Sequence, residues 1–162
     1  TEVSYMLKIS TKASINLSIA ISALFFVLCI AGAFILPTLV PLLIEMPDNI
    51  GSRDGISDSS RTLVMLTSYL ILADMFAANC FLFTLLQRVK KGLVFTPKSV
   101  FLIRSVSWCC YIICLLFIVL GFYFQLAFVV SFLAFFLGLC LRVTKNVIDE
   151  ATQIKNENDL TV

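Results

Sequence analysis

Residues 99–141, SVFLIRSVSWCCYIICLLFIVLGFYFQLAFVVSFLAFFLGLCL, decide the fold of this chain. They contain two apolar runs, over residues 99–121 and 125–141, and about 20 such residues in a helix cross a bilayer core about 30 Å thick. Only Phe122, Tyr123 and Phe124 separate the two runs. Helices joined by so short a connection must be antiparallel neighbours, so this stretch predicts a transmembrane helical hairpin.

The composition of the whole chain indicates the same class of protein. Of its 162 residues, 60% are hydrophobic and 14% are charged, whereas a soluble domain is about 45–50% apolar and about 25% charged. The polar residues are too few to form the polar shell of a soluble protein. The net charge is +2, so bulk charge gives no reason to expect direct binding of nucleic acid.

Two earlier apolar runs raise the number of predicted spans to four. One covers residues 62–87, and the other stays apolar over residues 15–44, which is too long for one straight span. Pro37 and Pro41 each remove an N–H and clash with the preceding turn. We therefore expect a first span over residues 13–36, followed by a kinked or irregular stretch. The predicted fold is an all-α, four-transmembrane-helix bundle that forms a single domain over residues 1–162.

The positions of the basic residues predict the orientation of the chain. Loops on the cytoplasmic side of a membrane are enriched in Lys and Arg. Ten of the 12 basic residues lie in the N-terminal segment, in or beside the connection over residues 88–98, or in the tail over residues 142–162. Only Arg53 and Arg61 lie in the first connection. We expect a multi-pass membrane protein with both termini cytoplasmic and the lipid bilayer as its first partner.

The tail over residues 142–162 has the pattern of an amphipathic helix. Val143, Val147, Ala151 and Ile154 recur at the spacing of one helical face, with charged residues between them. The fourth helix should therefore extend into the cytoplasm to about Lys155. Its apolar stripe would cover the membrane surface, the apolar part of the connection over residues 88–98, or a partner protein.

Asp74 lies midway along the span over residues 62–87, near the bilayer midplane. An ionised carboxylate there costs at least about 2.5–3.5 kcal/mol, so it should face the bundle interior. Arg61 and Arg104 are too distant in depth to pair with it. We expect Asp74 to be protonated or hydrogen-bonded to Ser, Thr, Tyr or Asn of another helix, and not to Asn79, which points elsewhere. A packing role and a sensing or ion site are both open.

Small polar residues mark one face of the first span. Ser14, Ser18 and Ser22 recur every four residues, a spacing that lets a neighbouring helix approach closely. Close helix packing and a polar groove for a ligand are both consistent with this pattern.

Residues that could support catalysis or bind a cofactor or metal are scarce. The chain has no His and six Cys, none of them in C-x-x-C spacing, so neither a redox pair nor a zinc site is indicated. A thiol oxidoreductase reading of Cys109, Cys110 and Cys114 is weaker than their use as small hydrophobic side chains. We expect no catalytic residue, no metal site and no cofactor.

Two stretches resemble a known family. FTPKSVFLIRSVSW, residues 95–108, and IKNENDLTV, residues 154–162, are similar to a bacterial membrane family described as domain of unknown function 2975. The residues that carry the resemblance are Phe95, Thr96, Arg104, Glu157, Asp159, Leu160 and Thr161. Members are typically encoded beside a very small helix-turn-helix DNA-binding protein of the Cro/repressor type. The resemblance therefore implies a membrane protein that sequesters or regulates a transcription factor, and it implies no catalytic residues.

Three functions are consistent with these observations. The leading hypothesis is a non-enzymatic regulator that binds a small helix-turn-helix protein on its cytoplasmic side, through Lys90, Lys91, Phe95, Arg104, Val147, Ile154, Asp159 and Leu160. The second is a small transporter or ligand-binding protein centred on Asp74, which would act as a homo-oligomer because four helices alone make a thin pore. The third is immunity against a membrane-active peptide.

Overall fold

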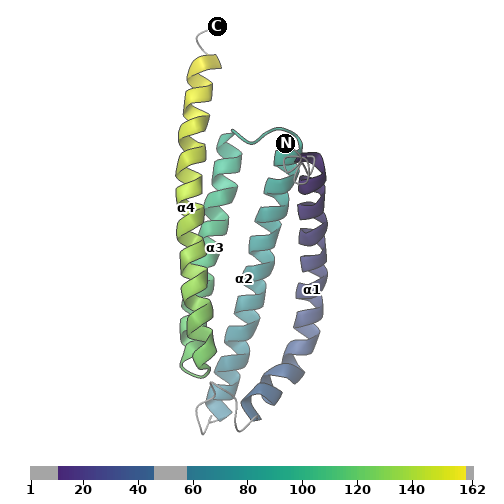
Figure 1. Cartoon of the computed structure of the whole chain (residues 1–162). Helices are drawn as coiled ribbons and strands as arrows, with labels where there is room; N and C mark the ends of the chain where they lie inside the picture. Colours follow the sequence, from purple (N-terminus) through teal and green to yellow (C-terminus); the bar gives the residue numbers. More distant parts are fainter. Residues whose placement is uncertain (1–10, 46–57, 160–162) are drawn as a thin grey trace, which may run out of the picture.

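The computed structural model describes residues 11–45 and 58–159, which form four helices joined in antiparallel order (Figure 1). These are α1 (Thr11–Glu45), α2 (Asp58–Lys90), α3 (Pro97–Gly121) and α4 (Gln125–Asp159). Each is long and apolar enough to cross a membrane. The predicted all-α fold with four transmembrane helices is confirmed, and the chain is a multi-pass membrane protein.

The helices pack in the order in which they occur along the chain. Among the described residues, the backbone of α1 lies close to that of α2, α2 to α3 and α3 to α4, and no other pair of helices approaches so closely. Large apolar side chains such as Phe34 and Phe132 point outward, with 79% and 70% of their surface exposed. This open arrangement suits a bilayer, where lipid chains cover apolar faces that water would not tolerate.

The first helix continues through both of its prolines. The span expected over residues 13–36 lies inside a longer helix, which includes Pro37 and Pro41 and ends at Glu45. Pro37 cannot donate the helical hydrogen bond to the carbonyl of Ala33. The hydroxyl of Tyr69 on α2 donates to that carbonyl oxygen instead, at 3.4 Å. A neighbouring helix thus supplies a hydrogen bond in place of the one that Pro37 removes, which favours continuation of the helix past residue 36.

The connection between α3 and α4 is the three-residue turn predicted from Phe122, Tyr123 and Phe124. The amides of Tyr123 and Phe124 donate to the carbonyl of Leu120 at 3.0 and 2.9 Å, which closes α3. A Cβ at Gly121 would lie 2.8 Å from the ring of Phe128. The glycine therefore allows the two helices to approach closely at the turn.

The connection between α2 and α3, residues 91–96, is held by hydrogen bonds at both ends. Gly92 has φ +74° and ends α2 in the left-handed conformation that glycine favours. Thr96 caps α3, and its hydroxyl accepts from the amide of Ser99. Arg88 of α2 donates to the hydroxyls of Thr96 and Ser99 at 2.9 and 3.3 Å. The loop is thus braced by the helix that precedes it.

The fourth helix extends beyond the other three at the end of the bundle that carries the α2–α3 loop (Figure 1). It is 35 residues long, whereas α3 has 25, a difference of about 15 Å. The prediction that the fourth helix extends as one continuous element is confirmed. We call this end of the bundle the loop end.

Candidate functional site

Asp74 lies between α2 and α3, where its carboxyl group is close to the thiol of Cys109. The Oδ2 atom is buried, with no hydrogen-bond partner in the described part of the chain. That Asp74 faces the bundle interior with a hydroxyl or amide partner stays a prediction, and the groups beside it on α3 are thiols.

A second polar contact inside the membrane joins α1 to α2. The hydroxyl of Ser22 donates to Oδ1 of Asn79 at 2.7 Å, and Nδ2 of Asn79 donates to the backbone carbonyl of Ser22 at 2.9 Å. Both residues are buried. The sequence indicated Ser22 as part of a packing face but did not identify Asn79 as its partner. The sequence contains a signal for this contact, because Asn79 is a second polar residue, after Asp74, in the middle of the same apolar span.

A groove of about 610 Å³ runs along the same region and receives side chains from all four helices. Most of its lining is apolar, including Phe25, Leu82 and Leu137, while Ser22, Asn79 and Cys110 supply polar atoms. Asp74 is not part of the lining, although Met75 and Cys110 beside it are. The groove could accept an apolar molecule, or the acyl chain of a lipid, with a few polar contacts.

The cysteines form no disulfides, and all six are free thiols. Cys109 and Cys114 are buried at helix contacts, and Cys114 lies 3.3 Å from the hydroxyl of Ser131 on α4. Among residues 11–45 and 58–159, no group of three or more His, Cys, Asp or Glu side chains is arranged to hold a metal ion.

The predicted docking residues of the α2–α3 connection lie at the loop end. Lys90, Lys91 and Phe95 are exposed. Because Arg88 braces the loop from inside, these three side chains project from a fixed backbone.

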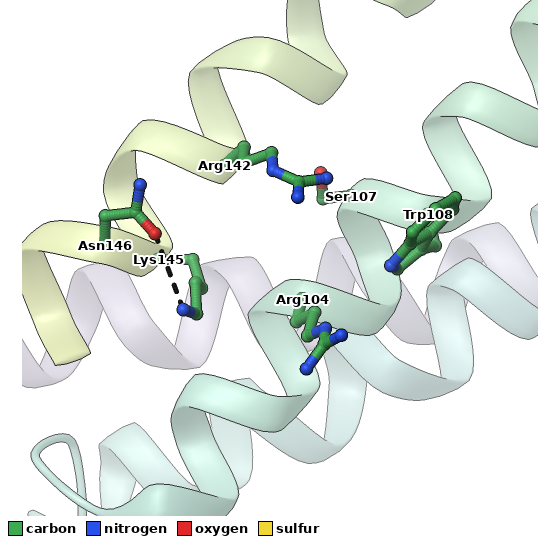
Figure 2. A pocket seen from close by; sticks show the side chains of 6 residues that line it. All are labelled: Arg104, Ser107, Trp108, Arg142, Lys145 and Asn146. Atoms are coloured by element: carbon green, nitrogen blue, oxygen red, sulfur yellow. Dashed lines mark hydrogen bonds between the residues drawn. The ribbon is translucent and has the colours of Figure 1, made fainter.

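Arg104 lies apart from this loop, in a pocket between α3 and α4 (Figure 2). The pocket has a volume of about 230 Å³ and is lined by Arg104, Ser107, Trp108, Arg142, Lys145 and Asn146. The guanidinium of Arg142 lies over the ring of Trp108, 6.0 Å from its centroid. The sequence alone places Arg104 beside the loop. How α3 is rotated about its axis relative to α4 cannot be read from the sequence, and that rotation turns Arg104 toward the pocket.

The predicted apolar stripe of the tail is present on α4. Val143, Val147 and Ile154 have 64%, 62% and 54% of their surface exposed. Ala151, the fourth residue of the predicted stripe, is half-buried, and Thr152 on the opposite face is buried. Asp159 ends α4, but its side chain and the whole of Leu160 lie outside the described residues. The loop, the pocket and the stripe share one end of the molecule and form three separate surfaces, all remote from Asp74.

Comparisons with known proteins identify the family of the chain. No curated protein and no solved structure matches it. A family model matches residues 8–162, and this chain belongs to the family described as Protein of unknown function (DUF2975).

Proposed function

We propose that this protein is a non-enzymatic regulator that holds a small helix-turn-helix DNA-binding protein at the cytoplasmic face of a bacterial plasma membrane. The observation that carries the proposal is the exposed apolar stripe on α4, which continues to Ile154 on the part of the helix that extends beyond the bundle. The distribution of basic residues supports a cytoplasmic position for this end. The family resemblance supports the kind of partner.

The geometry of the stripe favours a protein over the membrane surface as its partner. At 100° per residue, Val143, Val147 and Ile154 fall within about 40° of one another around the helix. The helix is continuous to Asp159, so the stripe follows the direction of the transmembrane helices and leads away from the bilayer. An apolar face in that direction is best covered by a helix of another protein.

The charges beside the stripe suit a basic partner. Residues 143–159 carry four acidic side chains and two basic ones, namely Asp149, Glu150, Glu157, Asp159, Lys145 and Lys155. DNA-binding proteins present a basic surface to the phosphate backbone, and complementary charge speeds association and selects partners. A partner bound through that surface would be kept from DNA, which is how a membrane protein could sequester a transcription regulator.

The test is a pull-down from native membranes, followed by mass spectrometry and by binding of the recovered protein in purified form. We expect a helix-turn-helix protein to co-purify with the full chain and to be lost when residues 143–162 are deleted. The double substitution Val147→Asp, Ile154→Asp should weaken binding of the purified partner at least about tenfold, because it places two charges in an apolar contact.

The matched control is Thr144→Asp with Gln153→Asp, which adds the same charge at two exposed positions of α4 outside the stripe. This control should bind the partner as tightly as the unmodified chain. Recovery of no DNA-binding protein, or equal binding by both double variants, would overturn the proposal.

A second candidate function is binding or transport of an apolar molecule, supported by the buried Oδ2 of Asp74 and by the groove beside it. Polar atoms without partners are costly in a bilayer and often mark functional positions. A transport path would require a homo-oligomer, because four helices alone make a thin pore.

This candidate is tested in liposomes that contain the purified protein. Proton- or ion-coupled uptake that is present in the unmodified chain and absent in Asp74→Asn would support it. Uptake that is absent from both proteins would exclude coupled transport.

A further inference from the structure

We propose that the pocket lined by Arg104, Arg142 and Lys145 binds the phosphate of an anionic phospholipid. We call it the basic pocket. It is separate from the stripe on α4. The pocket residue Arg142 lies about a third of a turn around that helix from the stripe. The proposal therefore stands independently of the partner protein proposed above.

The depth of the two arginines matches the level of lipid phosphates. Arg104 and Arg142 lie the same number of residues from the α3–α4 turn, about 26 Å along their helices. The hydrocarbon core is about 30 Å thick, so both guanidinium groups reach the boundary on the loop side. Trp108, which lines the same pocket, belongs to a residue type that concentrates at this boundary.

The charges of the basic pocket are incompletely balanced by the protein. Lys145 forms an ion pair with Asp149 at 3.0 Å and donates to Asn146 (Figure 2). No carboxylate partner is present for Arg104 or Arg142 within residues 11–45 and 58–159. Both arginines line the pocket between α3 and α4. A bound phosphate would supply the missing negative charge and accept hydrogen bonds from the guanidinium groups.

The wall of the basic pocket is fixed by the contact between α3 and α4. The hydroxyl of Ser107 donates to the carbonyl of Gly138 at 2.9 Å. A Cβ at Gly138 would lie 2.9 Å from the ring of Tyr111, so only glycine allows this close approach. The two helices therefore hold the arginines in a defined arrangement, and the site is largely formed before a ligand arrives.

An aromatic track leads from the basic pocket toward the bilayer centre and favours a lipid over a soluble anion. The rings of Trp108 and Tyr111 are 6.1 Å apart, and those of Tyr111 and Phe135 are 5.9 Å apart. Trp108 and Phe135 are exposed. Tyr111 and Phe135 lie about 15 Å from the turn, at mid-depth. A phospholipid would place its phosphate among the arginines and an acyl chain along these rings.

The only tryptophan of the chain is Trp108, so its fluorescence reports directly on this site. The full-length protein is reconstituted in phosphatidylcholine vesicles that contain increasing fractions of brominated phosphatidylglycerol or, separately, brominated phosphatidylcholine. Bromine quenches tryptophan on contact, and the two curves give the relative affinity of the site for the two lipids. We expect a preference of about fivefold or more for phosphatidylglycerol, the effect of one well-placed arginine.

The double variant Arg104→Gln, Arg142→Gln should bind both lipids about equally, because it removes both cations that lack a carboxylate partner. Each curve is normalised to vesicles without bromine, since Arg142 also contacts Trp108. The single variant Arg104→Gln leaves the contact of Arg142 with Trp108 in place and should lose part of the lipid preference. It keeps the proposal testable if the double variant does not fold. The matched control is Lys90→Gln, Lys91→Gln, which removes the same charge from the exposed loop and should keep the preference.

Three results would overturn the proposal. They are equal quenching by both lipids in the unmodified chain, a preference that survives in the double arginine variant, and a preference lost equally in the lysine control. Inorganic phosphate added to phosphatidylcholine vesicles separates the two sources of phosphate. A response of Trp108 to free phosphate without any lipid preference would assign the pocket to a soluble anion and also overturn the proposal.

Discussion

The hydroxyl of Tyr69 lies 3.4 Å from the carbonyl oxygen of Ala33, one turn before Pro37. That carbonyl is the one that Pro37 cannot satisfy, because proline has no N–H. In a bilayer no water is available to replace the missing donor. Tyr69 therefore couples α2 to the only stretch of α1 that contains prolines, and α1 remains helical to Glu45.

Removal of this hydroxyl in Tyr69→Phe should lower the free energy of unfolding by about 0.6 kcal/mol, the average for interhelical hydrogen bonds in membranes. The cost should shrink in a Pro37→Ala background, where residue 37 again donates to Ala33. A double-mutant cycle of reversible unfolding in mixed micelles measures both effects. Tyr123→Phe is the control, and equal costs in the two backgrounds would contradict the account.

The pair formed by Ser22 and Asn79 should stabilise the contact between α1 and α2. Asn79→Ala removes both hydrogen bonds and should cost up to about 1.7 kcal/mol. Ser22→Ala should cost less, because the backbone carbonyl of Ser22 still accepts from Asn79. Ser18→Ala, on the same face of α1, is the control, and unfolding in mixed micelles is the measurement. A cost for Ser22→Ala as large as that for Asn79→Ala would contradict this ranking.

The close contact between α3 and α4 should make Gly138 intolerant of a side chain. A Cβ there would lie 2.9 Å from the ring of Tyr111 and 3.3 Å from Cβ of Cys110. Gly138→Ala should therefore cost about 1–3 kcal/mol. Gly32→Ala is the matched control, since its nearest neighbour, Leu72, would be 3.5 Å away, an ordinary contact. Thermal unfolding that is equal in both variants would show that α3 and α4 adjust without cost.

Asp74→Asn should fold with unchanged or higher stability. The substitution keeps the shape of the side chain and removes the cost of a charge inside the membrane. Unfolding in mixed micelles measures the difference, and Asp149→Asn, which breaks an exposed ion pair, provides the comparison. A clear loss of stability in Asp74→Asn would show that the carboxylate itself stabilises the contact of α2 with Cys109. Unchanged stability with altered signalling or uptake would identify Asp74 as functional.

The number of helices and the hairpin of α3 and α4 could be predicted from the sequence, because both depend on the lengths of apolar runs. The course of α1 could not, since the donor that replaces Pro37 comes from Tyr69 on another helix. The position of Arg104 in one pocket with Arg142 could not be predicted either. It depends on how α3 and α4 are rotated about their axes, and the contact at Gly138 sets that rotation.

Arg88 should control the shape of the loop over residues 91–96. Its guanidinium donates to Thr96 and Ser99, while the hydroxyl of Ser99 also donates to the carbonyl of Leu93 at 2.8 Å. Arg88→Gln removes the first two bonds and leaves the third. The loop should open more often, by at least about fivefold, which is the effect of losing one of these two hydrogen bonds.

Cleavage by a lysine-specific protease measures this opening, because Lys90 and Lys91 lie at the start of the loop and the substitution changes no lysine. We expect Arg88→Gln to be cut at least about fivefold faster than the unmodified chain. Arg104→Gln removes the same charge from the basic pocket and should be cut at the unmodified rate. Equal rates for all three proteins would mean that the backbone bonds of Gly92 and Leu93 to α2 hold the loop without Arg88.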